Sequence, residues 1–195
     1  RLCHASTVVG LAATFGSGAM TNSINEFDDA DLFFITGSDT TEQHPLIGSR
    51  ILRAVDRGAK MIVVDPRKIK LARHADMYLR QKCGTDVAWV NGMMNVIISE
   101  GLEAKEYVQN RVENFEELKE LVKEYTPEYV ETISGIPADE LKKAARLYAT
   151  TPKAMIVYSM GITQHTTGVD NVKSLANLAM LTGHVGFECT GVNPL

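Results

Sequence analysis

Two continuous apolar runs separated by a helical pattern most constrain the fold of this chain. Residues 31–37 read DLFFITG and residues 59–66 read AKMIVVDP. Strands that are apolar along their whole length are typical of parallel sheets, which are covered on both faces. Between the runs, residues 44–58 begin with His-Pro, carry spaced Leu and Ile, and end in Arg-Gly, as expected of a helix followed by a C-terminal glycine. We therefore expect a right-handed βαβ unit.

Similar signals continue toward the C-terminus. They predict a helix from a Thr-Asp cap at residues 85–86 to Gly101, a strand at residues 154–158, and a helix at residues 169–181 that stops at Gly183. Three further helical segments are expected between these elements, started by an approximate capping box of Asn114 and Glu117, by Thr126-Pro127, and by Pro137. Residues 191–195 read as a turn.

The predicted fold class is α/β: an open, mainly parallel, Rossmann-like sheet with helices on both faces and a helical insert. Residues 1–100 form the first part of the α/β core, residues 101–150 the insert, and residues 151–195 the return to the core. The chain begins at Arg1 rather than at Met. With the turn at its end, this suggests one fragment of a larger multidomain protein.

Composition excludes several classes of function. The 195 residues carry a formal charge of -4 and a pI near 5.7, without a basic cluster, so nucleic acid is not an expected partner. No apolar run approaches the roughly 20 residues that span a bilayer, and direct membrane insertion is not expected. Cys3, Cys83 and Cys189 are widely separated and form no CxxC pair, which favours a reducing compartment, with Cys83 and Cys189 as buried apolar thiols. A cytoplasmic location is the simplest interpretation, and a periplasmic parent is not excluded.

Polar residues follow each predicted strand, where open parallel sheets bind their ligands. The three segments are residues 37–42 (GSDTTE), 65–68 (DPRK) and 159–165 (SMGITQH). Taken singly, Asp39 could cap a turn and Arg67 could pair with Asp65 or Asp76 at the surface. Taken together, carboxylates, an arginine and a glycine turn suit a ligand with phosphates and a purine-like base. The chain has neither G-x-G-x-x-G after its first strand nor a Walker A motif.

The pair Cys3-His4 adds metal and proton chemistry to this set. A thiolate is a soft metal ligand, and imidazole titrates near neutral pH. In order along the chain, RLCHAS at residues 1–6, GAMTN at 18–22, DPR at 65–67, GITQ at 161–164 and LTG at 181–183 closely resemble the catalytic alpha subunit of molybdopterin-dependent formate dehydrogenases, within the dimethyl-sulfoxide-reductase family. The resemblance covers the whole chain, and its specificity comes from the order and spacing of the motifs.

This resemblance implies site residues and a cofactor. Cys3 matches the Cys or selenocysteine that ligates molybdenum or tungsten, and His4 matches the histidine that helps to move the substrate's proton. The implied cofactor is a molybdenum (or tungsten) bis-molybdopterin guanine dinucleotide. The positions that match its binding stretches are Ser38, Asp39, Glu42, Asp65, Arg67, Gly84, Asp86, Met160, Gly161 and Gln164.

The implied function is oxidation of formate to carbon dioxide, with electron-transfer subunits or domains as partners. The family pattern continues after the Asn-Pro turn with an arginine that orients formate, and an upstream cysteine-rich segment binds an iron–sulfur cluster. Neither is within this chain, so the isolated chain is expected to be inactive. Two alternatives remain open: another molybdopterin oxidoreductase of the nitrate or polysulfide reductase type, and a noncatalytic nucleotide-binding module in which Cys3 has no role.

Overall fold

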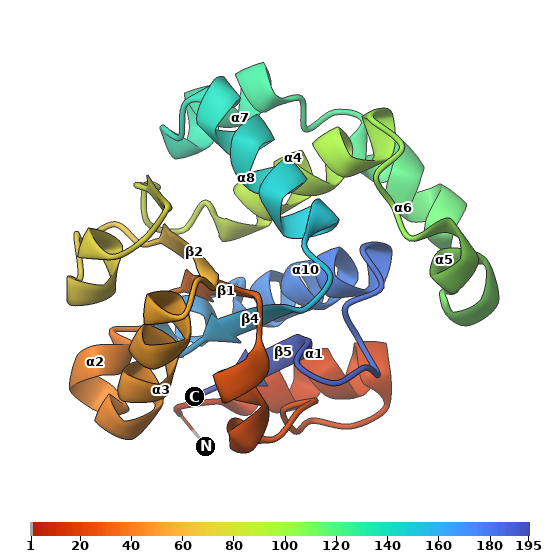
Figure 1. Ribbon diagram of the computed structural model, residues 1–195. Helices are drawn as coiled ribbons and strands as arrows, with labels where there is room; N and C mark the ends of the chain where they lie inside the picture. The colour runs from red at the N-terminus through yellow and green to blue at the C-terminus, as the bar shows by residue number, and fades with distance from the viewer. Residues whose placement is uncertain (1) are drawn as a thin grey trace.

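The computed structural model describes residues 2–195 and contains a five-stranded sheet whose paired strands are all parallel (Figure 1). The strand order is β3-β2-β1-β4-β5. The strands are β1 (Leu32–Thr36), β2 (Lys60–Val64), β3 (Met77–Leu79), β4 (Ala154–Tyr158) and β5 (Gly191–Pro194). The chain runs outward from β1 to β3 on one side and adds β4 and β5 on the other. The switch in direction therefore falls between β1 and β4, where doubly wound sheets bind ligands.

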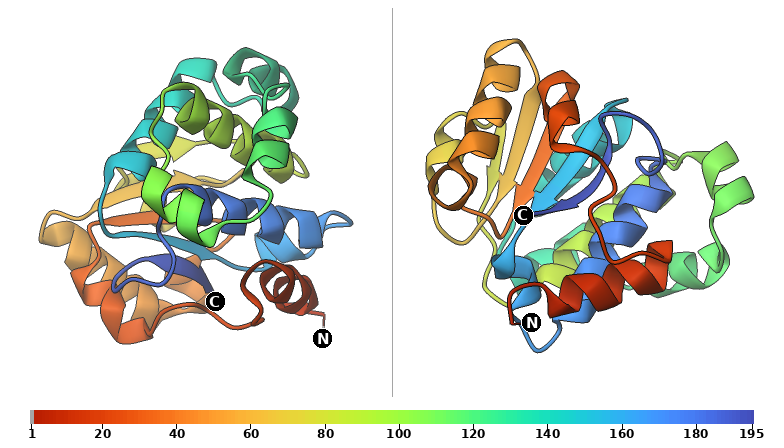
Figure 2. Two further views of the ribbon diagram at one scale, coloured as in Figure 1. Left: turned by 90° about the vertical axis from the view of Figure 1, so that its right-hand side faces the viewer. Right: turned by 90° about the horizontal axis from the view of Figure 1, so that it is seen from below.

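Helices cover both faces of this sheet. The α-helices are α1 (Ala5–Phe15), α2 (Thr40–Gln43), α3 (Pro45–Asp56), α4 (Asp86–Ser99), α5 (Lys105–Arg111), α6 (Phe115–Val122), α7 (Pro127–Ser134), α8 (Ala138–Thr150), α9 (Met160–Thr163) and α10 (Gly168–Leu181). Short 3₁₀ segments are η1 (Ile24–Asp29) and η2 (Lys70–Arg73). α4 packs against α7, α8 and α10, and α3 contacts η1. α1, in red, lies along α10, in blue, as Figure 2 shows.

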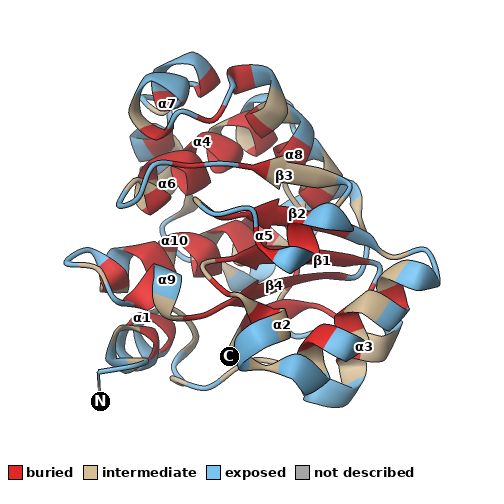
Figure 3. Cartoon of the chain, turned by 90° about the vertical axis from the view of Figure 1, so that its left-hand side faces the viewer, coloured by how far each residue is buried: buried red, intermediate tan, exposed pale blue. Residues whose placement is uncertain are grey.

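The central strands are buried (Figure 3). Their successive side chains enter two different cores, one on each face of the sheet. Phe34 packs with Trp89 of α4 and Tyr148 of α8, at ring-centroid distances of 5.8 and 5.6 Å. Its neighbour Phe33 faces the other way and packs at 6.0 Å against Phe27 of η1. The uninterrupted hydrophobicity of β1, which predicted a parallel strand, thus follows from burial on two sides.

The three predicted strands, the βαβ unit and the helices around residues 86–99 and 168–181 are confirmed. The interpretation of residues 191–195 as a turn was wrong, because Gly191–Pro194 forms β5, parallel to β4. The sequence conceals this strand because it is short and contains a glycine with φ of 98° and a proline, and proline is tolerated at a sheet edge, where its missing N–H is not needed.

Two predicted caps were also wrong. Thr85 precedes α4 but makes no side-chain capping hydrogen bond, because its hydroxyl donates to the carbonyl of Lys82 at 2.7 Å. Asn114 precedes α6 with φ of 58° and makes no side-chain capping hydrogen bond, so Asn114 and Glu117 do not form a capping box. Asparagine is one of the few residues that adopts this left-handed conformation readily. A capping box forms instead at η1, where the carboxylate of Glu26 accepts from the backbone N–H of Ser23.

Glu26 also joins distant parts of the chain. Its carboxylate accepts hydrogen bonds from the side chain of Asn22 and the backbone N–H of Cys189, both at 2.8 Å. The Asn22 bond, with those from Cys189 and Ser23, lowers the pKa of Glu26 to about 2 despite partial burial. The segment before β1 is thereby fastened to the segment before β5.

The predicted helical insert corresponds to α5–α8, and its apolar side chains share a core with α4 and the sheet. The division of the chain at residues 100 and 150 stays a prediction. None of the helices in the described residues is long and apolar enough to cross a membrane.

The turns after β1 and β4 cross in backbone contact. Gly161 donates its N–H to the carbonyl of Gly37 at 3.0 Å. A Cβ placed on Gly37, whose φ is +57°, would lie 2.7 Å from the backbone of Gly161. Gly37 is therefore required both for its conformation and for the closeness of the two turns.

We predict that Gly37→Ala lowers the free energy of unfolding by about 1–3 kcal/mol more than Gly16→Ala, because only the former forces two backbones apart. Gly16 has φ of +78° and open space around a Cβ, so its substitution isolates the conformational cost. Urea unfolding of both variants measures the difference, and equal losses would contradict the crossing.

A second prediction concerns pH and His184, which is 4% exposed and bonds to Thr182 and to the carbonyl of Thr151, both at 2.8 Å. Burial lowers the pKa of His184 in the folded chain. Below the ordinary pKa of about 6.5, the histidine therefore becomes protonated in the unfolded chain while it stays neutral in the folded chain. Stability should be constant above that pH and fall as the pH drops below it. The free energy of unfolding, measured from pH 8 to 5, should therefore decline less in His184→Gln than in the unsubstituted protein. An equal decline in the two proteins would show that His184 is not the group responsible.

Candidate functional site

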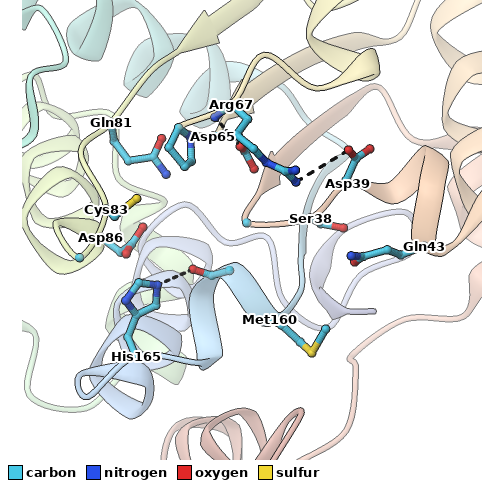
Figure 4. A pocket seen from close by; sticks show the side chains of 14 residues that line it. Ser38, Asp39, Gln43, Asp65, Arg67, Gln81, Cys83, Asp86, Met160 and His165 are labelled. Carbon is cyan, nitrogen blue, oxygen red and sulfur yellow. Dashed lines mark hydrogen bonds and ion pairs between the residues drawn. The ribbon is translucent and has the colours of Figure 1, made fainter.

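A pocket of about 230 Å³ opens at the carboxyl ends of the strands, beside the crossing of Gly37 and Gly161 (Figure 4). It is lined by Gly37, Ser38, Asp39, Gln43, Asp65, Pro66, Arg67, Gln81, Cys83, Gly84, Asp86, Met160, Gly161 and His165. Ligand pockets commonly measure about 300–1,000 Å³. This pocket therefore suits one end of a large ligand.

Asp65 and Arg67 follow β2 and form the charged side of the pocket. Asp65 is 5% exposed, and its carboxylate accepts from the backbone N–H of Arg67 at 2.8 Å. Burial raises the pKa of Asp65, while the Arg67 N–H and guanidinium oppose the rise. The guanidinium itself is exposed, and its carboxylate partner Asp39 lies 3.9 Å away. An arginine held this loosely at a pocket rim can turn its planar fork onto a phosphate.

The opposite side is formed by the segment between β3 and α4. Asp86, the first residue of α4, is 3% exposed and accepts from the indole N–H of Trp89 at 3.3 Å. Burial raises the pKa of Asp86, and the Trp89 hydrogen bond opposes it. Gln81 is 6% exposed, and its Oε1 is buried without a hydrogen-bond partner. A buried acceptor without a donor is costly, and a ligand N–H entering the pocket would satisfy it.

Most of the residues predicted from the sequence come together here: Ser38, Asp39, Asp65, Arg67, Gly84, Asp86, Met160 and Gly161. Two do not line the pocket. Glu42 lies on α2 and pairs with Lys70 at 3.5 Å. Gln164 follows α9, and its side-chain amide donates to the backbone oxygen of Leu2 at 3.1 Å.

Sequence reasoning missed Gln43, Gln81 and Cys83 as lining residues. His165 ends the polar segment 159–165 that the sequence indicated, but it is not among the predicted site residues. The interpretation of Cys83 as a buried thiol was wrong, since it is exposed and borders the pocket, whereas Cys189 is 5% exposed as expected. The turn that carries Cys83 leaves the short strand β3, whose first two residues are only half-buried. A three-residue strand has too little pattern to place the residues after it.

The segment with Cys3 and His4 contacts α9, the short helix that also borders the pocket. Thr163 of α9 donates its hydroxyl to the backbone oxygen of Cys3 at 2.8 Å. Met160 and Gly161, one turn earlier, line the pocket. The Cys3 thiol is free and exposed. α9 therefore connects the predicted metal ligand to the predicted nucleotide pocket.

His4 is held by partners on both ring nitrogens. Nε2 lies 2.7 Å from the backbone oxygen of Leu195, and Nδ1 lies 2.9 Å from the hydroxyl of Thr7. The contact with Leu195 places the imidazole at the carboxyl end of β5. Within residues 2–195, no three His, Cys, Asp or Glu side chains are grouped to hold a metal ion.

These residues fit one end of a nucleotide-bearing cofactor. The pocket offers buried carboxylates and the orphaned Gln81 oxygen for the N–H groups of a base, and an exposed, loosely held guanidinium for phosphate. Gly84, with φ of +77° and open space where a Cβ would stand, leaves the backbone accessible.

Comparisons with known proteins identify the family to which this chain belongs. The chain is 54% identical, over all 195 residues, to the F420-dependent formate dehydrogenase subunit alpha of Methanocaldococcus jannaschii, of which it spans 29%. It is 47% identical over its full length to formate dehydrogenase H of Escherichia coli, of which it spans 27%. The structure of acetylene hydratase from Pelobacter acetylenicus superposes with a TM-score of 0.86 at 34% identity, over 93% of this chain and 25% of that one.

The chain spans less than a third of these relatives, yet the similarity covers all or nearly all of its own length. The family description "Molybdopterin oxidoreductase" matches residues 1–195 without interruption. With the pocket at the switch point and Cys3-His4 beside it, the chain belongs to the molybdopterin oxidoreductase family.

Proposed function

We propose that the protein carrying this chain is the catalytic subunit of a formate dehydrogenase that oxidises formate to carbon dioxide. The observation that carries the proposal is the meeting of Cys3-His4 and the polar pocket at one short helix, α9. Identity of 54% and 47% to formate dehydrogenase subunits supports formate as the substrate. The fold alone would not, because acetylene hydratase shares it.

The proposed cofactor is a molybdenum or tungsten bis-molybdopterin guanine dinucleotide. When bound, it accepts the two electrons that leave formate as it becomes carbon dioxide and a proton. Asp65, Asp86 and Gln81 would accept from the N–H groups of a guanine, and Arg67 would bind phosphate. The Cys3 thiolate would ligate the metal, and His4 beside it would position a proton next to the substrate.

The proposal extends to partners and location. Electrons that leave formate need an acceptor, so we propose electron-transfer subunits or domains as partners. We also propose that an iron–sulfur cluster outside this chain is the first carrier to receive these electrons. Free thiols at Cys3 and Cys83 support a reducing compartment, and we propose the cytoplasm.

Substitution of Cys3 tests its proposed role as the metal ligand. Cys3→Ala in the complete protein should reduce formate oxidation to background, because a methyl group cannot ligate a metal. Activity is measured with a dye acceptor, with molybdenum and tungsten content and pterin fluorescence determined on the same samples. Unchanged metal and pterin content, with no formate oxidation by either protein, would favour the noncatalytic nucleotide module. Turnover of nitrate but not formate by the unsubstituted protein would favour another reductase.

The second prediction concerns Arg67. Arg67→Ala should weaken binding of guanosine diphosphate by about 10- to 100-fold, the loss of one charge-assisted contact to phosphate. Lys68→Ala is the matched control, since it removes the same charge from an adjacent exposed residue that does not line the pocket. Calorimetric titration measures both. Equal weakening by the two variants would indicate general attraction by positive charge and would count against a phosphate site at Arg67.

A further inference from the structure

Behind His4, two hydroxyl groups form a continuous row that enters the core. The Thr7 Oγ1 atom, on the first turn of α1, lies 2.9 Å from His4 Nδ1 and 3.0 Å from the hydroxyl of Tyr158 at the end of β4. Thr7 is 2% exposed and Tyr158 is fully buried. The rings of His4 and Tyr158 meet edge to face, with centroids 6.3 Å apart. The imidazole therefore joins α1, β4 and β5.

The partners of this row determine where its protons lie. The backbone oxygen of Leu195 can only accept, so Nε2 of His4 must carry the hydrogen. In the neutral imidazole Nδ1 is then an acceptor, and Thr7 must donate to it. Since a hydroxyl has one proton, Thr7 must in turn accept from Tyr158. Every N–H and O–H of the row has an acceptor in this one arrangement.

Two further observations support this direction of proton donation, from Tyr158 through Thr7 to His4. Burial raises the pKa of Tyr158 above its ordinary value, although the Thr7 hydrogen bond opposes the rise, so its hydroxyl keeps its proton at neutral pH. Ser159, the next residue after β4, donates to the same backbone oxygen of Leu195 at 2.8 Å. That oxygen is therefore fixed as an acceptor by donors on two sides.

We propose that Thr7 and Tyr158 are positioning residues that hold His4 as the Nε2–H tautomer and direct that N–H toward the carboxyl end of β5. This inference rests on the proposed function. Nδ1 is committed to Thr7, so Nε2 is the nitrogen that can exchange Leu195 for a substrate oxygen, and it begins as a hydrogen-bond donor. Such a donor suits an anionic carboxylate, the chemical class to which formate belongs.

Nitrogen-15 NMR of the whole protein, labelled at histidine, tests the tautomer directly because protonated and unprotonated ring nitrogens resonate far apart. His4→Gln assigns the His4 signals. We expect one tautomer, with hydrogen on Nε2 and a hydrogen-bonded, unprotonated Nδ1. Thr7→Val, which keeps the shape and removes the hydroxyl, should shift the Nδ1 signal, and Thr7→Ser, which restores the hydroxyl, should return it.

Tyr158→Phe should produce a smaller shift of Nδ1 in the presence of Thr7 and none in the Thr7→Val background, since its effect passes through Thr7. Thermal unfolding of each variant shows whether it folds. Hydrogen on Nδ1 in the unsubstituted protein, or a folded Thr7→Val variant with unchanged His4 signals, would overturn the proposal. The spectra require neither metal, pterin nor formate. A different His4 tautomer would therefore not contradict formate oxidation, and an absence of formate oxidation would not change the tautomer that the spectra show.

Discussion

The contact between Gly37 and Gly161 is the constraint on which the rest of the site depends. Where β1 and β4 end side by side, their two exit turns must cross, and a hydrogen bond of 3.0 Å joins them with no room for a side chain. The crossing brings α9 against the end of β1. The loop after β1 and the helix after β4 therefore border a single pocket, although more than 100 residues separate them in the chain.

How far the sequence predicts this site depends on how each residue reaches it. Asp39, Asp65 and Arg67 closely follow long apolar strands, so their place at the carboxyl edge could be inferred from hydrophobicity and parallel pairing alone. Gln81 and His165 reach the pocket through a three-residue strand and a four-residue helix. Such short elements carry no periodicity, so only tertiary packing fixes the positions of the residues after them.

The resemblance to formate dehydrogenases identified Cys3 and His4, but the contacts of His4 could not be inferred from it. Thr7 is one turn along α1, and Tyr158 is the last residue of a strand whose apolar run offered no reason to single it out. Their meeting depends on α1 lying along α10 and beside the end of β4, an arrangement fixed by core packing.

The fastening of β5 has a consequence for how this sheet meets other chains. An edge strand ordinarily exposes unpaired N–H and C=O groups that another strand can adopt. Here Thr21 closes part of that edge, because its N–H donates to the carbonyl of Val192 at 3.2 Å and its hydroxyl accepts from the Val192 N–H at 2.9 Å. Pro194 offers no donor beyond them. Within the described residues, the β5 edge is thus a poor template for strand addition.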